Sequence, residues 1–291
     1  MHEDEIAIDD EVVRRLVATQ LPAAADLPLQ RLTTWGTDHV IFRLGDDLSV
    51  RMPKIEWAAE QGRLESSWLP RLAPALPLEI ATPVLVGEPD LGYPFPWYVT
   101  PWLAGSNPEP ADDLSQLAVD LASFVCALEA LDTTVAPHVE DGRRGGPLEA
   151  ADESTREAAE QLRGEPAVDG LLAAWAAGVA AAPWTGPPRW VHGDLMSGNL
   201  VLRAGRLTGV IDWGGLTTGD PAVELMVAWS LFDARTRVAY REALGFVDDD
   251  MWLRGRAWAV SAALQALPYY RDTNPDIVAR SWRTVHAVLA S

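Results

Sequence analysis

The sequence predicts an α+β protein with two lobes, a small strand-rich N-terminal lobe and a larger, mostly helical C-terminal lobe. Short β-rich runs and turn residues dominate the chain before about residue 103, whereas apolar residues after it recur mainly at helical spacing. Between them, residues 101–113 (PWLAGSNPEPADD) are rich in Pro, Gly and acidic residues, which is typical of a linker. We therefore place the two lobes at residues 1–103 and 104–291.

The N-terminal lobe is expected to begin with a helix and to continue as a sheet. Asp9 or Asp10 would cap the helix, and Gly45-Asp46-Asp47 would supply a hairpin turn. The expected elements are a helix over 9–20, a hairpin of Val40–Leu44 and Leu48–Met52, a helix over 56–69, and strands around Val84–Gly87 and Trp97–Thr100.

The C-terminal lobe shows its clearest helix over residues 114–131, where seven apolar side chains fall on one stripe. Residues 137–165, which include GRRGG at 142–146, predict an exposed loop followed by helical segments. The other expected elements are a β-hairpin of Leu200–Leu202 and Leu207–Ile211 and helices over 222–232, 236–244 and 251–267.

The charge of the chain limits its partners. Its formal net charge is −19, from 23 basic and 42 acidic residues. Nucleic acids and anionic membranes require clustered Lys and Arg, so we expect no nucleic-acid and no membrane partner. A cationic small molecule would instead be attracted. The alternative is that the acidity serves only the solubility of the chain.

The sequence shows no sign of a membrane or secretory location. It lacks a run of about 18 or more apolar residues, and its N-terminus opens with acids rather than with the positive charge of a secretory signal. The single cysteine, Cys126, excludes an internal disulfide. We expect a cytoplasmic protein, either a monomer or a homodimer.

Three oxygen-bearing side chains surround the second hairpin. Asp194 and Asn199 lie on a loop just before it, and Asp212 lies just after it. Because a hairpin brings its two ends together, we expect the three side chains to converge. Such hard oxygen ligands suit Mg²⁺, with Asn199 and Asp212 as metal ligands. Asp194 would accept or orient the proton of an attacking hydroxyl in phosphoryl transfer.

These motifs resemble those of the aminoglycoside phosphotransferase family, relatives of the protein kinases. The resemblance rests on His192-Gly193-Asp194 with Asn199, on Ile211-Asp212-Trp213 and on Gly219-Asp220-Pro221, in that order, and it extends from about Leu32 to Tyr270. It implies a bilobal protein-kinase-like fold, ATP or GTP with Mg²⁺ as cofactors, and a small-molecule hydroxyl acceptor. It also implies that His192 holds the loop and that the aspartate of the last motif braces it.

On the nucleotide side, the family places a lysine on the third strand and pairs it with a glutamate on the next helix. Here Arg51 lies on the strand face opposite Val50 and Met52, whereas Lys54 follows the end of the strand, so we favour Arg51 over Lys54 as the phosphate-binding residue. For the helix glutamate we prefer Glu65 to Glu60.

The resemblance further implies a phosphate-covering loop with Thr37 as a donor. It also implies a hinge over Tyr98–Leu103 in which Tyr98, Thr100 and Trp102 are the candidate nucleotide-binding residues. The chain departs from the family at Met196-Ser197, where His-Pro is frequent, and at Glu224, where Asp is frequent.

The acceptor implied by the resemblance is an aminoglycoside-like antibiotic or a related metabolite. A macrolide, choline, homoserine or a sugar remains an alternative, as does a catalytically silent nucleotide-binding protein. The retained Asp194, Asn199 and Asp212 argue against silence, and the missing strand lysine is its only support.

Overall fold

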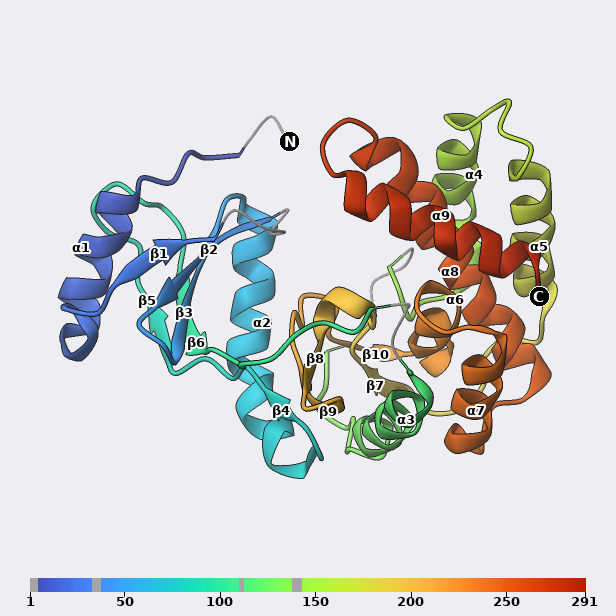
Figure 1. Ribbon diagram of the computed structural model, residues 1–291, viewed down its shortest axis with the longest axis horizontal. Coiled ribbons are helices and arrows are strands. Elements are labelled where there is room, and N and C mark those ends of the chain that lie inside the picture. The colour runs from blue at the N-terminus through green and yellow to red at the C-terminus, as the bar shows by residue number, and fades with distance from the viewer. Residues whose placement is uncertain (1–4, 33–37, 110–112, 138–142) are drawn as a thin grey trace. The chain divides into compact units, whose positions relative to one another are not determined.

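The computed structural model describes residues 5–32, 38–109, 113–137 and 143–291 (Figure 1). Within these residues the chain forms two compact units, each described by itself below. The first contains the chain up to Pro74 together with Glu79–Gly105 and Gly209–Gly214, and the second contains Ala75–Leu78, Ser106–Thr208 and Gly215–Ser291. A strand-rich first unit and a mostly helical second unit confirm the α+β class expected from the sequence.

The first unit is built on a five-stranded antiparallel sheet in the order β1-β2-β3-β6-β5 (Figure 1). Its elements are α1 (Asp10–Gln20), β1 (Leu29–Arg31), β2 (His39–Leu44), β3 (Leu48–Pro53), α2 (Glu56–Leu72), β4 (Glu79–Ile80), β5 (Leu85–Gly87) and β6 (Trp97–Pro101). The expected hairpin is confirmed, with Leu44 opposite Leu48. The second helix was expected to end at residue 69, but it continues past Pro70 to Leu72.

The core of this unit lies between α1 and one face of the sheet. Val50 and Met52 of β3 are fully buried in a cluster with Leu16 of α1 and Phe42 of β2. Burial of each such side chain contributes about 1.5–3 kcal/mol to stability. Because side chains alternate along a strand, this packing points Arg51 away from the core.

Helix α2 approaches the sheet closely at Gly62. A Cβ atom on Gly62 would lie 2.1 Å from Cε2 of Tyr98, so any other residue would clash with the Tyr98 ring. The Tyr98 hydroxyl also donates to the Ala59 carbonyl oxygen at 3.0 Å. These contacts hold α2 against β6 and fix the position of Glu65, which lies three residues after Gly62 on the same helix.

The second unit consists mainly of helices packed around α8. Its helices are α3 (Ser115–Glu129), α4 (Asp152–Glu160), α5 (Val168–Ala180), α6 (Val227–Ser230), α7 (Ala234–Leu244), α8 (Asp249–Tyr270) and α9 (Pro275–Leu289), with 3₁₀ segments at Leu148–Ala151, Ser197–Asn199 and Pro221–Met226. Helix α8 packs against α5 and α9, and α3 packs against α7. Neither α5 nor α9 was among the helices expected from the sequence.

Short strands position the motif residues of this unit. β7 (Arg189–Val191) pairs antiparallel with β10 (Thr217–Gly219) and leads directly into His192-Gly193-Asp194. The expected second hairpin is present as β8 (Leu200–Arg203) and the first part of β9 (Arg206–Val210). The end of β9 pairs in parallel with β4 inside the first unit and leads into Asp212.

None of the helices in the described parts of the chain has the length and apolar character that crossing a bilayer requires.

Candidate active site

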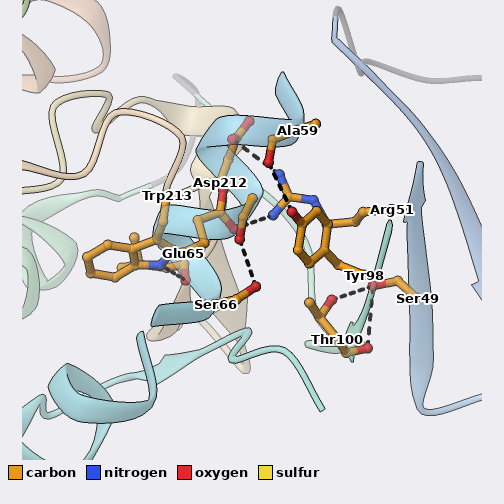
Figure 2. Close-up of polar contacts among 11 residues, drawn as sticks. Ser49, Arg51, Ala59, Glu65, Ser66, Tyr98, Thr100, Asp212 and Trp213 are labelled. Carbon is orange, nitrogen blue, oxygen red and sulfur yellow. Dashed lines mark hydrogen bonds and ion pairs between the residues drawn. The ribbon is translucent and has the colours of Figure 1, made fainter. Parts of the chain in front are cut away.

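In the first unit, Arg51 and Glu65 form a buried ion pair (Figure 2). Nη1 of Arg51 donates to Oε2 of Glu65 at 2.7 Å, and the two side chains are 14% and 4% exposed. Lys54 instead pairs with Glu5 at 3.3 Å. The strand residue that meets the glutamate of α2 is therefore Arg51, and the glutamate is Glu65.

Asp212 lies beside this pair. Its Oδ1 is 3.7 Å from Nη2 of Arg51, and its side chain is 57% exposed. Its backbone is left-handed, with φ 61°, which is uncommon for a residue other than glycine but better tolerated by Asp than by most. The next residue, Trp213, is buried and donates to the Val210 carbonyl oxygen at 3.2 Å, which anchors the turn.

The charges within this group affect the pKa values of Arg51 and Glu65. Burial alone would lower the pKa of Arg51, but the carboxylates of Glu65 and Asp212 outweigh it, and the pKa is raised. Burial raises the pKa of Glu65, and Asp212 adds to this effect while Arg51 opposes it. An arginine held so firmly in its charged form beside an open carboxylate is suited to binding phosphate oxygens.

The expected hinge residues have structural partners. Thr100 is buried with its hydroxyl 2.8 Å from that of Ser49 (Figure 2), and the backbone N–H of Trp102 donates to the Asp47 carbonyl oxygen at 2.7 Å. Nucleotide binding by Tyr98, Thr100 and Trp102 stays a prediction. Thr37 lies outside the described residues.

In the second unit, residues 192–199, which form the expected catalytic loop, turn sharply at Gly193. Its φ is +78°, and a Cβ atom there would lie 2.8 Å from the Gly215 carbonyl oxygen, so glycine is required. His192 is fully buried, and its Nδ1 accepts from the backbone N–H of Asp194 at 3.2 Å. These contacts are those of a residue that supports the loop.

Asn199 and Asp194 are joined directly. The Asn199 side-chain amide donates to the backbone oxygen of Asp194 at 2.8 Å and to its Oδ2 at 3.1 Å. Asn107, which no sequence motif indicated, donates to the carbonyl oxygens of Gly198 at 3.1 Å and Leu200 at 2.9 Å and so supports the loop from outside.

Arg144 was also missed, because the sequence predicted only an exposed loop around it. Its Nη1 donates to Oδ1 of Asp194 and, at 3.3 Å, to the Gly193 carbonyl oxygen. The GRRGG segment gave a local signal of positive charge, but nothing in the sequence indicated that this charge would lie against Asp194.

The resemblance implied that Asp220 braces the loop, but its side chain has other partners. Asp220 accepts instead from the backbone N–H of Ala222 at 3.0 Å and from Nε of Arg254 at 2.7 Å. Glu224, on the same 3₁₀ segment, is buried, and its Oε1 accepts from the backbone N–H of Gly193 at 2.9 Å. The implied bracing role of Asp220 is therefore wrong, and Glu224 fills it.

A second buried carboxyl group, that of Glu129, interacts electrostatically with Glu224. Burial raises the pKa of Glu224 to about 7, against the backbone hydrogen bonds from Gly193 and His192 that lower it. Burial, with the charge of Glu224, raises the pKa of Glu129 to about 8. Each has one carboxyl oxygen without a hydrogen-bond partner among the described residues, so ionising either is costly.

Glu129→Gln is expected to make stability less dependent on pH. Because the pKa of Glu129 rises from 4.5 to about 8 on folding, the folded state keeps a proton that the unfolded chain releases. This group alone should lower wild-type stability by about 1.4 kcal/mol per pH unit across that window. Glutamine keeps the shape without titrating. The stability of the Glu129→Gln variant relative to wild type should therefore increase with pH up to about pH 8. Urea unfolding at several pH values measures this, and a constant difference from wild type would contradict it.

The two side chains expected to hold a metal each keep an oxygen atom available, one in each unit. The side-chain oxygen of Asn199 accepts no hydrogen bond from the described residues, because only its nitrogen is used, and the Asp212 carboxylate is half exposed. Among the described residues no cluster of three or more His, Cys, Asp or Glu could hold a metal alone. Metal binding by Asn199 and Asp212 stays a prediction.

The sequence and the fold both match known proteins. A family model described as the phosphotransferase enzyme family (APH) matches residues 30–258. No curated protein matches the sequence.

Solved structures match the chain over nearly its whole length. The GDP complex of wild-type aminoglycoside 2'-phosphotransferase-IIIa is 20% identical, with a TM-score of 0.77, and the match covers 97% of this chain and 99% of that one. The GDP and kanamycin complex of APH(2")-IIia is 20% identical, with a TM-score of 0.76 and coverages of 96% and 98%. Macrolide 2'-phosphotransferase MphH from Brachybacterium faecium, as apoenzyme, is 21% identical, with a TM-score of 0.65 and coverages of 96% and 97%. These matches confirm the expected protein-kinase-like fold.

Proposed function

Because the chain belongs to the phosphotransferase enzyme family, we propose that it transfers the γ-phosphoryl group of ATP or GTP to a hydroxyl group of a small molecule. The observation that carries this proposal is the buried Arg51–Glu65 ion pair with Asp212 beside it. A phosphate-binding cation held by a helix glutamate, next to a metal-binding aspartate, is the arrangement used by protein kinases.

In the proposed reaction the acceptor hydroxyl oxygen bonds to the γ-phosphorus, and the bond to the bridging oxygen breaks to release a nucleoside diphosphate. Asp194 orients the hydroxyl and takes its proton, while Glu224 and Asn107 hold the loop that carries Asp194. Bound Mg²⁺ would neutralise phosphate charge as transfer proceeds. Asn199 and Asp212 would hold it, and Arg51 would bind phosphate oxygens.

The family does not determine the acceptor. The chain's net charge of −19 supports a cationic acceptor such as an aminoglycoside, and one matched structure is a kanamycin complex. A macrolide is the second candidate, because macrolide 2'-phosphotransferases match with similar coverage.

A coupled nucleotide-consumption assay with Mg²⁺ tests the proposal. The panel contains aminoglycosides, macrolides, amino alcohols, sugars and hydroxy acids, each with ATP and with GTP. One class should stimulate nucleotide consumption, and Asp212→Ala should abolish the stimulation because it removes a metal ligand. Silence of the whole panel, with nucleotide binding intact, would instead favour a nucleotide-binding protein without transferase activity.

A further inference from the structure

Two arginines lie against the catalytic loop of the second unit. Arg144 donates to Asp194 Oδ1 and to the Gly193 carbonyl oxygen. Arg280, on α9, approaches the same loop from another element, since its Nη1 lies 3.4 Å from the position of a Cβ atom on Gly198. We call Arg144 and Arg280 the arginine pair.

The arginine pair gives this part of the unit an excess of positive charge. Arg144 is paired with Asp194, whereas the guanidinium of Arg280 makes no ion pair or hydrogen bond with any residue that the structure describes. Burial lowers the pKa of Arg280, while the charges of Asp194 and Asp276 act in the opposite direction and that of Arg283 adds to the lowering. The partly buried guanidinium of Arg280 therefore has no carboxylate within ion-pair distance among the described residues.

Both carboxylate oxygens of Asp194 already accept hydrogen bonds, Oδ1 from Arg144 and Oδ2 from Asn199. An acceptor hydroxyl that needs Oδ1 must share it with the Arg144 guanidinium or replace it. An anionic group on the acceptor would give that guanidinium a new partner and would also pair with Arg280. An ammonium group at the same place would meet like charges on both arginines.

The local charge is opposite in sign to that of the whole chain. The net charge of −19 acts over the surface and is screened beyond about 8 Å at physiological ionic strength. At contact distance the guanidinium groups beside Asp194 dominate. An acceptor can satisfy both effects if it carries its anionic group near the reacting hydroxyl and any positive charge farther away.

We propose that the arginine pair binds a carboxylate or phosphate group of the hydroxyl acceptor, which is therefore an anionic or zwitterionic hydroxy compound. This inference rests on the proposed kinase function. When the acceptor binds, Arg144 moves from Asp194 to the acceptor's anionic group and leaves Asp194 Oδ1 open to the hydroxyl proton. Arg144 and Arg280 thereby determine specificity, and neither takes part in the bond changes.

Calorimetry with small anions tests the arginine pair without knowledge of the natural acceptor. The protein is first saturated with Mg²⁺ and a non-hydrolysable nucleoside triphosphate analogue, so that the nucleotide's own phosphates are in place. Malonate and inorganic phosphate are then titrated separately, with the neutral malonamide as the matched control for malonate. Saturable binding of at least one anion is expected, and malonamide should bind at least about tenfold more weakly than malonate.

Variants assign the binding to the two residues. Arg144→Gln and Arg280→Gln should each weaken anion binding about tenfold or more, because each removes a charge-assisted hydrogen bond. Arg280→Lys keeps the charge and should retain part of the affinity, which separates binding from any effect on folding. Arg235→Gln, at an exposed arginine of α7 in the same unit, should leave binding unchanged.

The inference is overturned if neither anion shows saturable binding, if malonamide binds as well as malonate, or if anion binding survives both glutamine substitutions. It is also overturned if anions bind only when the nucleotide analogue is absent, because the arginines would then serve the nucleotide. The nucleotide-consumption assay tests the kinase proposal independently of the arginine pair. Anion binding through the arginine pair without turnover of any hydroxyl compound would reject the kinase proposal alone. Turnover stimulated by kanamycin and indifferent to both arginines would reject the arginine pair alone.

Discussion

Replacing Asp194 with alanine is expected to lower kcat by about 10²–10⁴-fold while nucleotide affinity changes little. The substitution removes the carboxylate that we propose takes the hydroxyl proton, and it removes one of the two oxygens to which the Asn199 amide donates. Because the effect arises after the nucleotide has bound, it should appear in kcat. Steady-state kinetics with the acceptor found in the screen measure it, and calorimetry reports nucleotide binding independently.

Two further variants separate chemistry from folding in this experiment. Asp194→Asn keeps the size of the side chain and an oxygen for Asn199, so it should fold like wild type and remain nearly inactive. Asp272→Ala, at an exposed aspartate of the same unit, should retain full activity. Nucleotide consumption that survives Asp194→Ala and Asp194→Asn would show that another group takes the proton or that none is needed.

The parts of the candidate site that were predictable are those governed by local geometry. The five-residue spacing between Asp194 and Asn199 places both on one loop, where the amide of one reaches the carboxylate of the other. The two-residue period of β3 put Arg51 opposite Val50 and Met52, and the structure places those two in the core. On α2, Glu60 lies five residues before Glu65, about 140° away around the helix, and is exposed.

The choice between Asp220 and Glu224 needed three-dimensional information. Both are carboxyl groups on or next to the 3₁₀ segment that starts at Pro221, and they lie four positions apart in the sequence. Which one reaches Gly193 depends on how that segment packs beneath β7. The position of Arg254 on α8, which takes Asp220 as its partner, also decides it. Neither the packing of the 3₁₀ segment nor the position of Arg254 can be predicted from the Gly219-Asp220-Pro221 motif.

The two unplaced helices were missed for different reasons. Helix α5 (VDGLLAAWAAGVA) is apolar nearly all round, so its sequence lacks the polar face on which a helical period depends. Helix α9 did carry a local signal, since Asn274 caps it by accepting from the Ile277 N–H at 3.1 Å and Pro275 occupies the first turn. The approach of Arg280 to the catalytic loop depends on the packing of α9 and had no sequence signal.

Replacing Arg51 with alanine is expected to weaken both the fold and nucleotide binding. It leaves the buried carboxyl of Glu65 without a counter-charge, which costs about 3–5 kcal/mol. The loss should shrink as pH falls toward 4.5, the ordinary pKa of Glu65, because the unpaired carboxyl is then protonated in both the folded and the unfolded state. Thermal or urea unfolding at pH 5 and pH 8 measures this difference, and equal losses at both would contradict it.

A double substitution separates the two roles of Arg51. Arg51→Ala with Glu65→Ala removes the unpaired charge as well, so it should recover much of the stability lost in the single variant. Nucleotide affinity should remain low, because the phosphate-binding cation is still missing. Lys54→Ala is the matched control, since Lys54 pairs with Glu5 rather than with α2, and its nucleotide affinity should stay near wild type. Loss of nucleotide binding in Lys54→Ala, together with its retention in Arg51→Ala, would assign the phosphates to Lys54 and leave the Arg51–Glu65 pair a purely structural role.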